Sequence, residues 1–144
     1  MGALMIWHKR LLLAAFVALT PGWVAAWRAY NWHDVFAVSK TEFEVIGRPG
    51  SGAVDYWCGA GDYVRHGLGQ PATTRIYIWR AIGPSVIQSG YKAVQFSLTA
   101  PENASPSPGY SLSVKAVGDN LTAAAAFQFC LGNNRFDPFV PRGG

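Results

Sequence analysis

The chain has 144 residues, of which 50% are hydrophobic, twelve are Lys or Arg and eight are Asp or Glu. This length suits one domain with one hydrophobic core. The formal net charge of +4 comes mostly from basic residues that stand singly in the sequence, so the composition argues against a nucleic-acid partner.

Residues 1–26 have the pattern of a secretory signal peptide. Lys9 and Arg10 precede an unbroken apolar run, Leu11–Leu19, and small residues suited to signal peptidase follow it up to Ala26. The run is shorter than the roughly 20 residues that cross a membrane as a helix. We therefore expect cleavage after Ala26 and a secreted, periplasmic mature chain without membrane insertion. Its net charge falls to +2, from ten basic and eight acidic residues.

The beginning of the mature chain predicts two strands. Residues 32–39 are one candidate, and residues 41–46 alternate apolar with acidic side chains, which is typical of a half-buried strand. In the second strand Phe43 is expected to face the core, whereas Glu42 and Glu44 are expected to face solvent.

An amphipathic helix is expected over residues 55–69. Trp57, Val64 and other apolar residues recur on one side at helical spacing, and glycines follow the periodic run. Gly59 and Gly61 each cost roughly 1 kcal/mol relative to alanine inside a helix. Close packing or a crosslink must therefore hold this segment helical.

Three more strands are expected further along. They cover residues 75–80, 92–99 and 110–116. Each is rich in β-branched and aromatic residues or alternates in polarity. In the strand at residues 92–99, Gln95 and Ser97 are expected to face outward. Residues 101–109 are rich in proline and serine and predict an exposed loop.

Residues 119–130 predict a second short helix, because possible caps at Asn120 or Thr122 precede four consecutive alanines. The alternative is a hairpin turn at residues 118–120 followed by a strand at residues 121–129. Residues 132–144 contain two prolines and end in two glycines, and they are expected to form a flexible C-terminal tail.

These elements together predict a single α+β domain over residues 27–131. The expected architecture is a small, mostly antiparallel sheet of three to five strands with two helices on one face.

Cys58 and Cys130 are the two cysteines of the chain. In an exported protein they are expected to form one disulfide, which would tie the first helix to the end of the second. Thiol chemistry is the competing interpretation. Trp57-Cys58-Gly59 begins like a thioredoxin-type site, but Gly61 stands where that motif needs its second cysteine.

A protease-type use of Cys58 would need a histidine base nearby in space. His66 lies two helical turns along the chain and points to a different arc of the predicted helix, which leaves only His33. The sequence therefore gives little support to Cys58 as a nucleophile.

Asp55, Asp62 and His66 share the polar arc of the first predicted helix. With His33 and Asp34 as further candidates, they could form a metal or acid/base site. The i,i+4 spacing of Asp62 and His66 would suit two metal ligands, but two ligands do not make a metal site. We interpret this arc as a solvated face with an ion pair, and we expect no metal and no cofactor. A ligand pocket, if these elements form one, would draw on Trp57, Asp62, Tyr63, His66 and Arg75.

The segment Tyr56-Trp-Cys-Gly-Ala-Gly-Asp-Tyr63, followed by Arg75-Ile-Tyr77 and closed by Phe129-Cys130, resembles a set of small exported proteins of alphaproteobacterial type without an assigned function. The resemblance covers roughly residues 43–130. It implies export and the pairing of the two cysteines, and it implies no activity, ligand or catalytic residue.

We therefore expect a non-enzymatic envelope or binding protein whose partner is an envelope protein or a small ligand. The alternative is an enzyme or a thiol-dependent redox protein that uses Cys58, or an enzyme that uses the face formed by Asp55, Asp62 and His66. A free thiol in the native protein would favour the redox alternative.

Overall fold

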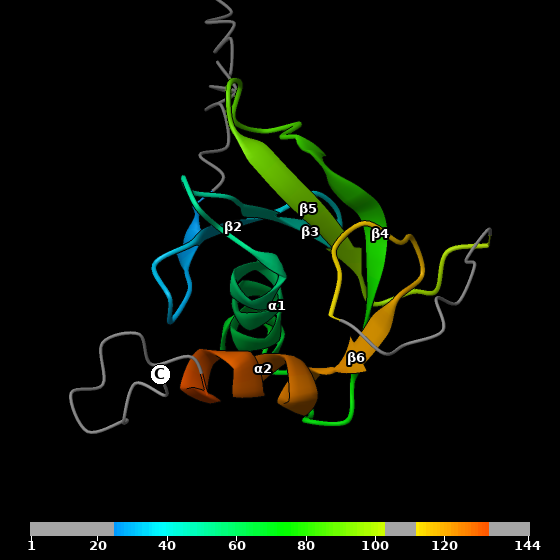
Figure 1. Cartoon of the computed structure of the whole chain (residues 1–144). Coiled ribbons are helices and arrows are strands. Elements are labelled where there is room, and N and C mark those ends of the chain that lie inside the picture. The colour runs from blue at the N-terminus through cyan, green and yellow to red at the C-terminus, as the bar shows by residue number, and fades with distance from the viewer. Residues whose placement is uncertain (1–24, 103–111, 133–144) are drawn as a thin grey trace, which may run out of the picture.

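The computed structural model describes residues 25–102 and 112–132, and in them it contains six strands and two α-helices (Figure 1). The elements are β1 (Trp27–Arg28), β2 (Asp34–Ala37), β3 (Glu42–Ile46), α1 (Ala53–Asp62), the π-helical turn η1 (Tyr63–Gly67), β4 (Arg75–Pro84), β5 (Lys92–Ser97), β6 (Asn120–Thr122) and α2 (Ala123–Gly132). The predicted α+β class is confirmed. The sheet has one strand more than the upper limit expected from the sequence.

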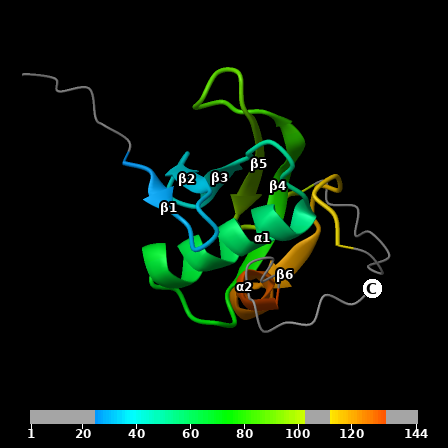
Figure 2. The ribbon, with the colours of Figure 1, turned by 60° about the vertical axis from the view of Figure 1, so that its left-hand side comes forward.

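The six strands form one sheet in the order β1-β2-β3-β5-β4-β6, and every neighbouring pair is antiparallel. The pairing of β4 with β5 shifts register between Ile78 and Arg80 and again between Arg80 and Gly83. Such irregularities bend a strand and increase its twist. The sheet therefore curls around α1, and α2 packs against α1 and β6 (Figures 1 and 2).

The core lies between α1 and the concave face of the sheet. Trp57 of α1 meets Phe96 of β5 edge-on, with ring centroids 4.9 Å apart, and Phe43 of β3 stacks on Phe96 at 5.7 Å. Val94, Phe96 and Phe43 are buried, as the alternating patterns predicted. The apolar side of the predicted helix and the inward residues of two strands were thus identified correctly.

The helix near residues 55–69 is confirmed, although its last turn is π-helical and ends at Gly67. Asp55 lies in the first turn, where its carboxylate accepts a hydrogen bond of 2.8 Å from the Gly52 N–H. An added Cβ at Gly59 would lie 2.8 Å from Val45, and one at Gly61 would lie 2.4 Å from the backbone nitrogen of Phe127. Both glycines are therefore required for close packing, on β3 and on α2 respectively.

The outward face of β3 and β5 is not solvated, and this part of the sequence prediction is wrong. Glu44, Gln95 and Ser97 are all buried. The connection from β4 to β5 folds over this face, so that Glu44 accepts hydrogen bonds from the Ser85 hydroxyl and from the N–H groups of Val86 (3.2 Å) and Ile87 (3.1 Å). A buried carboxylate is stable only when it has such donors.

Two other expectations need correction. Residues 112–116 of the predicted strand at 110–116 are not a strand, although Val114 is buried and its carbonyl accepts a hydrogen bond from Ile82. For residues 119–130 the sequence left two alternatives, a helix or a turn followed by a strand, and each is correct in part. β6 pairs with β4 as a strand, and α2 begins directly after it. Thr122 caps that helix through a bond from the Ala125 N–H. The predicted signal peptide up to residue 24, most of the 101–109 loop and residues 133–144 lie outside the described residues.

Cys58 and Cys130 form the predicted disulfide, with their Cα atoms 4.9 Å apart, and the bond joins α1 to α2. We expect the double variant Cys58→Ser/Cys130→Ser to lose about 4 kcal/mol of unfolding free energy, because the bond closes a long loop in the unfolded chain. Urea denaturation of the mature protein would measure the loss. As a control, a reductant should destabilise the natural protein and leave the double variant unchanged. Equal stability of the two proteins would contradict the prediction.

Candidate functional site

Two of the residues proposed for ligand binding serve the core. Trp57 is 1% exposed, and its indole N–H donates a 3.0 Å hydrogen bond to the carbonyl of Ser113. Tyr63 is half-buried and packs against Phe43, with ring centroids 4.8 Å apart. The sequence could not separate these aromatic residues from a binding patch, because both uses need the same side chains.

Asp62 is buried, so the prediction of a solvated arc is wrong at this position. One carboxylate oxygen accepts hydrogen bonds from the Trp27 indole (3.0 Å) and from the Tyr30 N–H (3.1 Å). The other lies 2.8 Å from Nδ1 of His66, which is itself exposed. The reason is that β1, which no pattern in the sequence predicted, lies beside the end of α1. Asp62 therefore anchors the first strand rather than facing solvent.

The proposed ligand residues do not meet in one place. Arg75 is exposed on β4 and donates a 2.6 Å hydrogen bond to Asn120. Among the described residues, no group of three or more His, Cys, Asp and Glu side chains could hold a metal ion. Both cysteines of the chain are in the disulfide, so the thiol-dependent alternative has no free thiol. No helix of the described part of the chain is long and apolar enough to cross a membrane.

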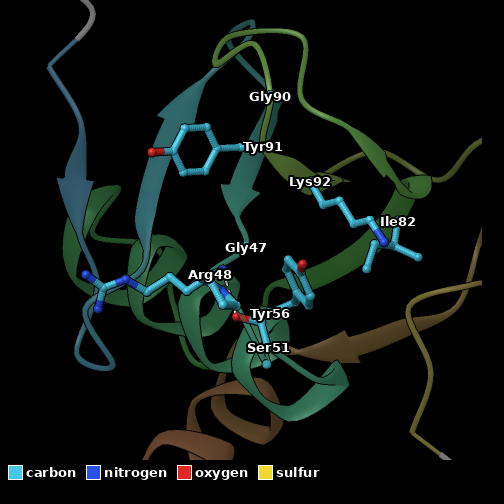
Figure 3. A pocket seen from close by; sticks show the side chains of 10 residues that line it. Gly47, Arg48, Ser51, Tyr56, Ile82, Gly90, Tyr91 and Lys92 are labelled. Carbon is cyan, nitrogen blue, oxygen red and sulfur yellow. Dashed lines mark hydrogen bonds between the residues drawn. The ribbon is translucent and has the colours of Figure 1, made fainter.

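The structure instead places two adjoining cavities at the N-terminal end of α1, and we call them together the α1 cleft. Their volumes are about 410 and 340 Å³, and both are lined by Ser51, Tyr56 and Ile82. The larger is also lined by Gly47, Arg48, Pro49, Gly50, Gly90, Tyr91 and Lys92, and the smaller by Gly52, Ala53, Leu112, Ser113, Val114 and Lys115. Figure 3 shows the larger cavity.

The Tyr56 hydroxyl is the most unusual polar group of the α1 cleft. The residue is 2% exposed, and its hydroxyl makes no hydrogen bond within the described part of the chain. No side-chain nitrogen or oxygen atom of the described residues is both buried and without a partner, so the hydroxyl oxygen is open to the cleft. It fits only because Gly47 has no side chain, since a Cβ there would lie 2.1 Å from the hydroxyl oxygen. Burial, and to a smaller extent the charge of Asp55, raises the pKa of Tyr56, so the hydroxyl stays protonated. It therefore offers a free donor to a ligand.

The cleft carries positive charge. Lys92 extends over the larger cavity toward Ile82, whereas the guanidinium of Arg48 points away from it (Figure 3). Lys115 lines the smaller cavity, and no acidic residue is among those that line either one. The N-terminus of α1 borders the smaller cavity at Gly52 and Ala53 and adds the positive end of the helix dipole. The Gly52 N–H is taken by the Asp55 carboxylate, whereas the Ala53 N–H has no acceptor inside the helix. An anionic group would be favoured here.

Ser51, which lines the cleft, forms a hydrogen-bonded pair with His33. Nε2 of His33 lies 2.7 Å from the Ser51 hydroxyl, and Nδ1 lies 3.2 Å from the carbonyl of Asn31. Because a carbonyl can only accept, Nδ1 carries the proton, and Nε2 accepts the hydrogen of Ser51. Burial lowers the pKa of His33, which keeps this neutral form dominant at pH 7.

The chain positions this pair by two local devices. Residues 48–51 form a turn in which the Ser51 N–H donates to the carbonyl of Arg48, with Gly50 at φ +83° where glycine is favoured. The Arg48 N–H in return donates to the Ser51 hydroxyl at 2.8 Å. The amide of Asn31 donates to the carbonyl of Asp55, which fastens the loop before His33 to α1.

Sequence reasoning missed Ser51 and Tyr56 as site residues, and it considered His33 only as a base for Cys58 or, with Asp34, as part of a metal or acid/base site. Residues 48–52, with proline and two glycines, predict a chain break before the helix, which does not say what the break faces. No spacing rule places residues 33, 51 and 56 together, because they come from three different elements.

The chain matches no known protein-family model, and neither a curated protein nor a solved structure is significantly similar to it. Its function must therefore be inferred from the geometry of the cleft.

The stability of the protein should fall below pH 6.5 because of His33. The unfolded chain titrates this group near pH 6.5, whereas burial lowers its pKa in the folded state. Between the two pKa values the unfolded state binds more protons, so the free energy of unfolding decreases as the pH falls from about 6.5 toward the folded pKa. We expect His33→Gln to show a smaller decrease between pH 7.5 and pH 5 in urea titrations. Parallel curves for the two proteins would refute the assignment.

Proposed function

We propose that the protein is an exported binding protein, stapled by one disulfide, that holds a small ligand with an anionic group in the α1 cleft. The observation that carries the proposal is the Tyr56 hydroxyl, which has no hydrogen-bond partner within the described residues and points into the larger cavity (Figure 3). No side-chain nitrogen or oxygen atom of these residues is both buried and without a partner, so the hydroxyl is open to the cavity, where a ligand or water can accept its hydrogen.

Charge supports an anion as the group that Tyr56 meets. Lys92 extends over the same cavity, and the N-terminus of α1 borders the adjoining one. A carboxylate or phosphate oxygen can accept from a hydroxyl, an ammonium and backbone N–H groups at once, and such charge-assisted hydrogen bonds are stronger than neutral ones.

The remaining lining supports an apolar or aromatic body for the ligand. Ile82 lines both cavities, and the larger one is also lined by Pro49 and Tyr91. Small-molecule sites commonly combine such apolar walls with a few polar groups that fix orientation. A small acid with a ring or short aliphatic part suits both features.

Phenyl phosphate and benzoate are suitable probes for this proposal, titrated into the mature protein and followed by amide chemical shifts in NMR. We expect shifts to centre on Gly47–Ala53 and Lys92. Lys92→Gln should weaken binding about tenfold, and Tyr56→Phe about threefold to tenfold. Tyr56→Phe should leave the thermal midpoint nearly unchanged, because the hydroxyl has no protein partner to lose.

Lys40→Gln is the matched control for Lys92→Gln, since it removes an equal charge from an exposed position outside the cleft. It should leave the affinity unchanged. The proposal fails if neither probe causes shifts around the cleft, or if Lys92→Gln and Tyr56→Phe both bind as the natural protein does.

The export part of the proposal rests on the signal-peptide pattern of residues 1–26, and the disulfide is compatible with it. We expect Gram-negative cells that produce the full chain to contain a mature form beginning at Trp27 in the periplasmic fraction, identified by its intact mass. Leu13→Arg should block export, because a charge interrupts the apolar run. Uncleaved natural protein in the cytoplasm would contradict the proposal.

A further inference from the structure

We propose that Ser51 is a nucleophile activated by His33, and that the α1 cleft can transfer an acyl group from an ester to the Ser51 hydroxyl. The chemistry rests on the contacts of these two residues. Only the expectation that the natural ester carries an anionic group rests on the proposed function.

The pair has the three parts that an activated serine needs. They are a nucleophile, a base in hydrogen-bond contact with it, and a group that orients the base. Nε2 of His33 is 2.7 Å from the Ser51 hydroxyl, and the carbonyl of Asn31 fixes the ring from the other side. Ser51 also lines both cavities of the cleft, so the nucleophile adjoins the space in which a substrate would lie.

The surroundings of His33 keep it an available base. Its strongest influence is burial, which disfavours the charged ring, and Arg48 acts in the same direction. Asp55 and Asp34 act in the opposite direction and favour the imidazolium that forms when the proton arrives. The ring of Tyr56 lies against that of His33, with centroids 6.3 Å apart, and completes the enclosure.

The N-terminus of α1 supplies stabilisation for the negative charge of the transition state. Gly52 and Ala53 line the same cavity as Ser51. The N–H of Gly52 is taken by Asp55, but the N–H groups at the start of a helix have no acceptor inside it. Donors and a helix dipole that face a developing oxyanion are among the largest contributions to acyl-transfer catalysis.

The reaction is balanced with the ester and water as its only reactants. The Ser51 oxygen forms a bond to the ester carbonyl carbon as its proton moves to Nε2 of His33. The bond from that carbon to the alcohol oxygen then breaks, and His33 returns the proton to the leaving alkoxide. Water, deprotonated by His33, releases the acid from Ser51 in the second half of the reaction.

A fluorophosphonate probe and 4-nitrophenyl acetate test the inference on the mature protein. With the first, the Ser51 oxygen displaces fluoride from phosphorus, and intact mass should rise by one adduct that peptide mapping places on Ser51. With the second, a burst of 4-nitrophenolate should appear. Both signals should be lost in Ser51→Ala and fall about 100-fold in rate in His33→Gln. Ser113→Ala is the matched control, because Ser113 lines the smaller cavity without a histidine partner.

The pH dependence of the Ser51 labelling rate tests whether His33 acts as the base. If the two residues had only a structural role, the protonation of His33 would not change this rate. The rate of the natural protein should rise with pH as His33 loses its proton, with a midpoint below 6.5. This measurement needs no variant, so it stays decisive if His33→Gln fails to fold. The inference is overturned if folded natural protein gives no adduct on Ser51, or if labelling shows no inflection below pH 6.5.

Failure of this inference and failure of the proposed function can be told apart. Both reagents are uncharged, so labelling does not require the anion site. Labelling without any phenyl phosphate or benzoate binding would support the nucleophile and refute the anion-binding function. Binding that depends on Lys92, without labelling of Ser51, would support the anion-binding function and refute the nucleophile.

Discussion

The packing of α1 against α2 is the constraint on which the rest of the structure depends. The α1 segment contains Gly59 and Gly61 and is therefore a poor helix former, yet its inner side carries Trp57 into the core. The disulfide of Cys58 and Cys130 and the direct contact of Gly61 with the backbone of α2 hold it in place. The two ends of α1 have different roles, because each end contacts different parts of the chain.

At its C-terminal end α1 serves the fold, and at its N-terminal end it borders the cleft. The carboxylate of Asp62 accepts hydrogen bonds from Trp27 of β1 and from the Tyr30 N–H. A residue that the sequence offered as a candidate for ligand binding therefore holds the first strand in place. Tyr56, by contrast, has a hydroxyl that is open to the cleft and has no hydrogen-bond partner in the described chain. A helix fixed this firmly can keep such a group in place, because the disulfide and the glycine contacts prevent the helix from shifting to satisfy it.

The proposed binding and the proposed acyl transfer use different parts of one cleft. Lys92 and Tyr56 would hold an anionic group in the larger cavity, whereas Ser51 lies where the two cavities meet. His33 reaches Ser51 from the loop before β2, so a single rigid frame supports both activities. The arrangement also explains why Gly47 is needed, since a side chain there would collide with the Tyr56 hydroxyl.

The sequence by itself determined the α+β class, the disulfide, and the inward faces of α1, β3 and β5. These follow from periodicity and cysteine count, which are local properties. It did not determine that Glu44 is buried, because the covering segment lies 41 or more residues away. For the same reason only the tertiary structure decided the cleft, which Ser51 and Tyr56 line, and the contact of Ser51 with His33. Which polar groups face one another depends on the curl of the sheet around α1, and no short-range pattern records it.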